Sequence, residues 1–296
     1  MTSGQSAAPD ALFAGLCTLD IIQAVDRLPG PNEKVTAVDQ TVAAGGPAAN
    51  AAVTFAFLGG NATLLTGVGQ HPLAEGIRDD LTRAGVRLTD TAADDGRPPP
   101  VSSILVTKGT GDRSVVSRNA AGRDLPPPPT LPSLVRRAGA VLIDGHHPRL
   151  AEAAARAARE QGRPCVLDGG SWKDNTASLL PQVDAAVCSA DFRPPDLDGD
   201  VLEYLLRRGA RWAAVTDGPR MVVWAGPDGR SGTVSVPRVT VADTLGAGDV
   251  FHGAFMYTIA EHGILNDDAF VSALRFGADV AARSCRAFGT RAWMGC

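Results

Sequence analysis

Apolar runs alternate with amphipathic segments along the second half of the chain. The apolar runs predict buried strands at 140–145, 164–170, 184–191 and 211–218. Helical patterns lie between and after them at 149–161, 198–208, 247–262 and 267–287, and a short hairpin is predicted at 221–236. Strands that alternate with helices predict an α/β fold, in which helices cover both faces of a parallel sheet.

The first half of the chain carries the same signals less regularly. The apolar run 11–19 predicts one buried strand that ends at Asp20, and residues 1–10 before it are expected to be disordered. A strand at 62–68 is predicted between two helices, at 47–58 and 72–84. The remaining segments predict exposed strands, at 21–44, 101–107 and 113–118. Proline clusters flank the last two, which form a hairpin set apart from the main body.

Composition excludes several classes of protein. The 296 residues carry 28 Lys and Arg against 32 Asp and Glu, and this net charge of −4 argues against a nucleic-acid-binding surface. Residues 40–74 are uncharged, but glycines interrupt them too often for a membrane span. The N-terminus lacks a signal-peptide pattern. Five cysteines, none at CxxC spacing, predict reduced thiols and a cytoplasmic location.

The segment 243–255, DTLGAGDVFHGAF, carries the strongest chemical signal. Its glycine-rich turn leads into an apolar helix, and the unpaired N–H groups at such a helix start bind anions. Gly246 and Gly248 let phosphate oxygens approach the backbone. Asp249 in the first turn is placed to accept a proton from an attacking hydroxyl, and the positive helix end predicts that it is ionised at neutral pH. The alternative is an Asp that only caps the helix.

The segment 45–60, GGPAANAAVTFAFLGG, is the second candidate. Two glycines precede a helix start of small residues, where a ligand can lie against the backbone and meet the amide of Asn50. The alternative is a tightly packed helix start with a solvent-facing Asn. Four predicted strands also end in polar or glycine residues, at 144–145, 168–170, 189–191 and 216–218. Ligands of open α/β sheets bind beyond such carboxyl ends.

These two segments, nearly 200 residues apart, resemble the two signatures of the ribokinase (PfkB) carbohydrate kinase family. The resemblance runs from about 11 to 291 and looks closest to the ketohexokinase and sulfofructose kinase branch. It implies a ribokinase-like, Rossmann-type sheet in one kinase domain, 11–296, with a small β-sheet lid from about 20–44 and 97–122. It also implies transfer of the γ-phosphoryl group from ATP, with Mg²⁺, to a hydroxyl of a ketose or related sugar derivative.

The resemblance assigns roles to particular positions. Asp249 matches the catalytic base, and the anion hole falls on Gly246, Ala247 and Gly248. The implied substrate-binding residues are Asp20, Gly45, Gly46 and Asn50. The implied ATP-binding residues are Ser189, Thr216, Gly218 and Gly277. Asp243 begins a segment that often holds a monovalent cation such as K⁺.

The chain also departs from the family pattern. Many members carry Asn-x-x-Glu after a central strand, where it organises magnesium, and here Ser189 and Asp191 occupy that stretch. Pro47 follows the glycine pair in place of a polar residue. A loop of Gly-Asp-Asp in many members is 69–71, Gly-Gln-His, in this chain.

The substrate is less well specified than the reaction. Asp20 and Asp144 suit the hydroxyls of a neutral polyol, whereas Lys34 and Arg113 suit an anionic substituent. The alternative for these two cations is protection of the edge of the lid, which is also a candidate dimer contact. A nucleoside kinase and a sugar- or nucleotide-binding sensor without turnover are the competing functions. The expected partners are therefore a sugar and ATP, with no nucleic acid and no membrane.

Overall fold

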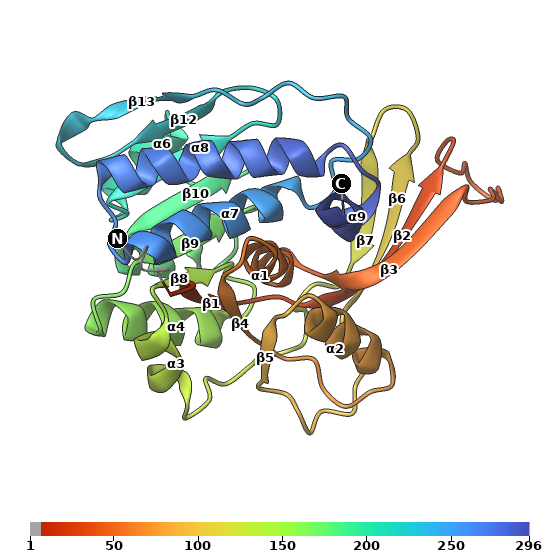
Figure 1. Cartoon of the computed structure of the whole chain (residues 1–296), viewed down its shortest axis with the longest axis horizontal. Helices are drawn as coiled ribbons and strands as arrows, with labels where there is room; N and C mark the ends of the chain where they lie inside the picture. The colour runs from red at the N-terminus through yellow and green to blue at the C-terminus, as the bar shows by residue number, and fades with distance from the viewer. Residues whose placement is uncertain (1–6, 296) are drawn as a thin grey trace, which may run out of the picture.

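A nine-stranded sheet forms the centre of the computed structural model, which describes residues 7–295 (Figure 1). Its strand order is β13-β12-β11-β10-β9-β8-β1-β4-β5. The strands from β5 to β11 in that order are parallel, and β12 and β13 are antiparallel. The bounds are β1 (Asp10–Ala14), β4 (Asn61–Thr66), β5 (Arg87–Asp90), β8 (Ala140–Ile143), β9 (Cys165–Gly169), β10 (Ala185–Ser189), β11 (Trp212–Thr216), β12 (Val222–Ala225) and β13 (Ser231–Val234).

Helices cover both faces of this sheet, as the sequence predicts. One face packs against α1 (Pro47–Phe57), α7 (Ala247–His262) and α8 (Asp267–Ser284). The other packs against α3 (Leu131–Arg137), α4 (Pro148–Glu160), α5 (Thr176–Leu179) and α6 (Val201–Arg207). On the first face, Phe13 of β1 meets Phe55 of α1 at a ring distance of 5.4 Å. The remaining helical segments are α2 (Leu73–Arg83), α9 (Gly289–Ala292) and the 3₁₀ turns Leu180–Gln182, Pro227–Gly229 and Trp293–Gly295.

A second sheet of four strands stands beside the main one, in the order β3-β2-β6-β7 (Figure 1). Its strands are β2 (Thr18–Val25), β3 (Asp39–Gly45), β6 (Val101–Thr107) and β7 (Arg113–Ser117). It packs Ile22, Ile104 and Val106 against Leu245 and Phe288, beside the start of α7 and of α9. The smaller sheet therefore faces the glycine-rich segment that the sequence singles out.

The prediction of one strand over 11–19 is wrong, because this run is divided between the two sheets. β1 ends at Ala14, and β2 begins at Thr18 in the smaller sheet. At Gly15 an added Cβ would lie 2.3 Å from the carboxylate of Asp144, so only glycine fits at the crossing. Both halves of the run are buried, so hydrophobicity alone carries no sign of the break.

Short elements account for most other differences. The sequence patterns give no prediction for β5, α3 and α5, which span seven residues or fewer. Such lengths hold too few positions for a periodic pattern. Of the segment 1–10, residues 1–6 lie outside the described residues, while Asp10 already belongs to β1, contrary to the expected disorder.

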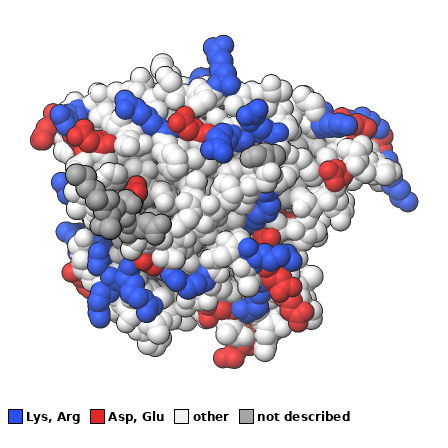
Figure 2. Space-filling view, in the orientation of Figure 1, with Lys and Arg blue, Asp and Glu red and all other residues white. Residues whose placement is uncertain are grey.

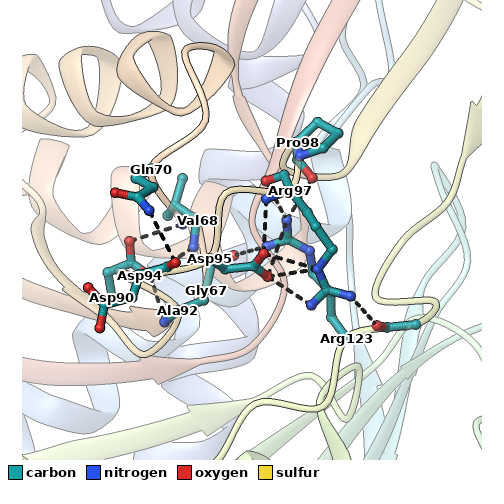
Figure 3. A network of polar contacts seen from close by, with 12 residues as sticks. Gly67, Val68, Gln70, Asp90, Ala92, Asp94, Asp95, Arg97, Pro98 and Arg123 are labelled. Atoms are coloured by element: carbon teal, nitrogen blue, oxygen red, sulfur yellow. Dashed lines mark hydrogen bonds and ion pairs between the residues drawn. The ribbon is translucent and has the colours of Figure 1, made fainter.

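A polar network ties the chain leading to β6 onto the main body (Figure 3). Arg123 donates to the carbonyl oxygens of Gly67, at 3.3 Å, and Pro98, at 2.6 Å. Its guanidinium also lies 3.9 Å from the carboxylate of Asp95. The backbone N–H of Gln70 donates to the Asp95 carbonyl at 2.9 Å. The 69–71 loop, Gly-Gln-His, therefore bonds through Gln70 to the connection that leads to the smaller sheet.

Both charge signs occur on the face of the molecule seen in Figure 2, where Lys and Arg are interspersed with Asp and Glu. Within residues 7–295, no helix has the length and apolar character needed to cross a membrane. The four cysteines in this range, Cys17, Cys165, Cys188 and Cys285, are free thiols.

Candidate active site

A cavity of about 280 Å³ lies where the carboxyl ends of the main strands meet the smaller sheet. The smaller sheet contributes Ser102, Ile104, Val115 and Ser117 to its wall. The smaller sheet also contributes Asp20 of β2, and the main body contributes polar groups from strand ends, helix starts and a loop: Asn50, Asp144, Asp168, Lys173 and Asp249. The cavity therefore combines apolar walls with many hydrogen-bonding groups, as small-molecule sites do.

The glycine-rich turn places the start of α7 at this cavity. Gly246 is the N-cap residue with a φ of 71°, a conformation that glycine adopts without strain. The buried carboxylate of Asp243 holds the turn by accepting hydrogen bonds from the N–H groups of Leu245, at 2.8 Å, and Gly289, at 2.9 Å. Of the predicted anion-hole amides, that of Ala247 donates to the Thr244 carbonyl at 3.3 Å.

Asp249 lies in the first turn of α7 and lines the cavity. Its Oδ2 accepts a hydrogen bond from Asn50 Nδ2 at 2.8 Å. Desolvation and the nearby charge of Asp168 raise its pKa to about 7, although the Asn50 bond and His252 lower it. The prediction of an ionised Asp249 at neutral pH therefore needs correction, because burial outweighs the positive helix end.

Close packing of α1 on α7 brings Asn50 and Asp249 together. A Cβ added at Gly253 would lie 2.5 Å from the Ala51 carbonyl oxygen, so the two helices touch at their backbones. The small residues at the start of α1 permit this approach. Asn50 is therefore directed at the start of α7 and not at solvent.

The predicted glycine pair, Gly45 and Gly46, makes room for the side chains and backbone around the cavity. An added Cβ at Gly45 would lie 1.9 Å from Asp20 Oδ2, so this glycine makes room for the carboxylate without lining the cavity. Gly46 lines the cavity with a φ of 92°. Asp20 accepts a hydrogen bond from the Thr18 hydroxyl at 2.6 Å, and burial raises its pKa.

Asp144 lines the cavity but already has backbone partners. Its Oδ2 accepts from the N–H of Leu16 at 2.7 Å and of Ala48 at 3.4 Å, and its Oδ1 accepts from the N–H of His146 at 2.9 Å. The carboxylate therefore joins the sheet crossing to the start of α1. A hydroxyl group bound in the cavity would use its remaining lone pairs.

Besides Gly45, two predicted substrate residues do not line the cavity. Lys34 is exposed in the connection between β2 and β3. Arg113 begins β7 and donates to the Thr244 hydroxyl at 3.1 Å, beside the glycine-rich turn. Neither cation is placed on the wall of the cavity.

Three of the four predicted ATP residues lie on a different part of the sheet edge. Ser189 and Thr216 are paired in register at the carboxyl ends of β10 and β11, and Gly218 follows with a φ of 52°. Gly277 is buried in α8, where an added Cβ would lie 3.0 Å from the Phe251 carbonyl oxygen. Its observed contacts are therefore those of helix packing.

The sequence places Asp168 only at a polar strand end and does not predict Lys173 or Arg291. Asp168 Oδ2 is buried without a hydrogen-bond partner, 3.5 Å from His252 Nδ1. The strand end 168–170 is predicted as a candidate ligand edge, but the sequence predicts no role for Asp168 itself. Lys173 lines the cavity from a loop, and Arg291 donates to Asn50 Oδ1 at 3.0 Å. No local pattern marks these two, because only tertiary contacts bring them to the site.

Comparison with known proteins agrees with this architecture. The family model described as pfkB family carbohydrate kinase matches residues 9–294. Ketohexokinase of Mus musculus is 24% identical over 293 residues, covering 93% of this chain and 95% of the relative. An ATP-dependent ribose-1-phosphate kinase of Halopiger xanaduensis is 28% identical over 258 residues, covering 83% of each. The structure of Arabidopsis thaliana ribokinase complexed with ribose and ATP shares the fold, with a TM-score of 0.76 at 22% identity over 95% of this chain and 94% of that one. With its α/β fold, second sheet and family match over nearly the whole length, the chain belongs to the pfkB family of carbohydrate kinases, which are ATP-dependent phosphotransferases.

Proposed function

We propose that this kinase transfers the γ-phosphoryl group of ATP to a hydroxyl of a ketose or related sugar derivative, with Asp249 as the base. The observation that carries the proposal is the position of Asp249. Its carboxyl group lies at a helix N-terminus, on the wall of a cavity of monosaccharide scale, and its pKa is near neutrality. A base is most effective when its pKa is close to the working pH.

In the proposed reaction, the sugar hydroxyl gives its proton to the ionised carboxylate of Asp249. The hydroxyl oxygen forms a bond to the γ-phosphorus, and the bond from that phosphorus to the β–γ bridging oxygen breaks, so its electron pair leaves with ADP. The start of α7 at Gly246 supplies amide groups and a positive helix end where negative charge gathers. Phosphoryl transfer needs mainly such alignment and charge stabilisation.

The donor set of the site suits Mg²⁺, which bridges and neutralises phosphate oxygens in kinases. Mg²⁺ prefers oxygen ligands and usually keeps several waters, with one or two carboxylates. Asp168 offers a buried carboxylate oxygen that accepts no hydrogen bond, with His252 Nδ1 3.5 Å away. Asp191 is exposed, and Ser189 Oγ donates to the Gly170 carbonyl at 2.8 Å. The stretch that replaces Asn-x-x-Glu therefore offers fewer free oxygen ligands for the ion. We therefore assign Asp168 as the residue that would hold the ion or its waters.

A nucleoside kinase is the main alternative within the family. Among the described residues that line the cavity, none is Phe, Tyr or Trp. Stacking of a nucleobase on an aromatic side chain is therefore not supported, and the hydroxyl-binding groups favour a sugar. A sensor without turnover is disfavoured by the intact combination of Asp249, Asn50 and the glycine-rich turn.

The test is ADP release from Mg-ATP with a panel of neutral ketoses, ribose, anionic sugars and adenosine. Asp249→Asn is the matched blank, because it keeps the size of the side chain and removes the base. The proposal is supported if a sugar stimulates ADP release and the rate is lower by a factor of about 10²–10⁴ in Asp249→Asn. Turnover with adenosine alone, or equal rates in the two proteins, refutes it.

The same panel decides the charge of the substrate. Lys34 and Arg113 lie off the cavity wall, so they give little support to an anionic substituent. Lys173 is on the wall, and its ammonium donates to the Ser171 carbonyl at 3.1 Å. If the enzyme prefers anionic sugars and Lys173→Met abolishes this preference, the Lys173 ammonium is the group that binds the anionic substituent.

Three further expectations remain predictions. A K⁺ requirement rests on Asp243, whose carboxylate is engaged by backbone N–H groups. A homodimer through the smaller sheet rests on its edge strand β7, where Val116 is 76% exposed. The dimer is tested by measuring the molar mass of the wild-type protein and of Val116→Lys by light scattering. The expected cytoplasmic location rests on the free thiols.

A further inference from the structure

Arg291 lies in α9, and acceptors surround its guanidinium. Nε and Nη2 donate to Asp80 Oδ2 at 3.2 and 3.1 Å, and Nη2 also donates to the Ala44 carbonyl at 2.6 Å. Nη1 donates to Asn50 Oδ1 at 3.0 Å and to the Thr290 carbonyl at 3.2 Å. These bonds employ all five N–H groups that a guanidinium possesses. The side chain is therefore fixed in one orientation.

The fixed guanidinium determines which way the Asn50 amide points. A guanidinium only donates hydrogen bonds, and an ionised carboxylate only accepts them. Asn50 must therefore turn Oδ1 to Arg291 and Nδ2 to Asp249, as the two distances of 3.0 and 2.8 Å show. The reversed amide would place donor against donor and acceptor against acceptor.

The same arginine holds the inner end of strand β3. Asp80 Oδ2 accepts from the Ala44 N–H at 3.0 Å, while Arg291 donates to the Ala44 carbonyl. Ala44 pairs with Leu19 of β2, the residue before Asp20. One partly buried ion pair, between Arg291 and Asp80, therefore fixes the base of the smaller sheet and, through Asn50, the amide next to Asp249.

We infer that Arg291 is a positioning residue for the base: it orients the Asn50 amide so that its N–H always donates to the Asp249 carboxylate. This inference rests on the proposed function, in which Asp249 accepts the proton. Arg291 itself does not line the cavity. It lies 241 positions from Asn50 in the sequence, beyond both family signatures.

The charges around Asp249 give the expected sign of an Arg291 substitution. Asp168 of β9 and Asp20 of β2 raise the pKa of Asp249, and His252 of α7 lowers it. The hydrogen bond from Asn50 of α1 also lowers it. A loosened Asn50 amide should therefore raise the pKa of Asp249.

The test follows the Asp249 carboxyl group by NMR titration of the full-length protein labelled at aspartate carboxyl carbons, with Asp249→Asn to assign the signal. Arg291→Met should raise the midpoint by about half to one pH unit, the effect of losing part of a charge-assisted hydrogen bond. Arg291→Lys keeps a positive charge beside Asp80 but cannot serve all the acceptors together. Arg291→Lys should therefore raise the Asp249 midpoint by less than Arg291→Met does. It also serves as the test variant if Arg291→Met fails to fold.

Arg283→Gln, on the exposed face of α8, is the matched control and should keep the wild-type midpoint. Wild-type midpoints in the folded Arg291 variants would overturn the inference. Arg291→Lys is also made in an Asn50→Ala background, where the rise should vanish. A rise that persists there would show that Arg291 does not act through the amide, and would equally overturn it.

Kinetics separates this inference from the proposed function. With an active wild-type enzyme, Arg291→Lys should lower kcat by about tenfold and move the acid limb of the pH profile upward. If the wild-type protein phosphorylates no sugar, the proposed function fails. The NMR midpoint still decides whether Arg291 positions Asp249, because that titration does not depend on turnover.

Discussion

Asp249→Asn should make the folded protein more stable while it removes most of the activity. Burial raises the pKa of this carboxyl group from its ordinary value of 3.8 to about 7. The folded state therefore binds the proton more tightly than the unfolded state, and stability falls as pH rises from about 4 to about 7. The difference between these pKa values corresponds to about 4 kcal/mol, and solvent screening of the partly exposed side chain reduces the cost to about 2–4 kcal/mol at pH 8. Asparagine carries no charge and avoids this cost.

Urea unfolding of the wild type and Asp249→Asn at pH 5 and pH 8 measures the effect. The advantage of the variant should grow by about 2 kcal/mol between the two values, because the folded wild type ionises over this range. Asp279→Asn, at an exposed position of α8, should show no such growth. An equal advantage at both pH values would refute the account of Asp249 as a costly buried carboxylate.

Three further substitutions or conditions test other parts of the structure. The kcat/KM of the wild type should rise about tenfold from pH 6 to pH 8, since the ionised fraction of Asp249 grows as pH passes about 7; a flat profile would contradict this. Gly45→Ala should raise the KM for sugar at least about tenfold, because the new methyl group would lie 1.9 Å from Asp20 Oδ2. Gly76→Ala, whose methyl group would meet its nearest atom at 3.8 Å, is its control in the same sugar titration. Phe55→Ala should cost about 3–5 kcal/mol in urea unfolding, because Phe55 is fully buried against Phe13 and Tyr257; a loss below about 1 kcal/mol would show that the core closes around the gap.

The sequence by itself determined the class of fold and the segments of the candidate site. The regular alternation of strands and helices after residue 139 defined the parallel sheet, because each period is a local property of the chain. The glycine-rich turn before Asp249 and the small residues around Asn50 were also local, so both segments could be recognised without a structure. The helix predicted over 247–262 agrees with α7, which spans Ala247–His262.

The tertiary structure decided how these parts meet. The crossing at Gly15 was invisible in the sequence because both sides of it are buried, in different sheets. The ionisation of Asp249 depended on burial and on Asp168, neither of which a helix N-terminus reveals. Arg291 reached Asn50 across 241 positions, in a segment of four helical residues with no periodic pattern. Local patterns record secondary structure, whereas the desolvation of a carboxylate and the partner of a guanidinium are set by distant segments that only folding brings together.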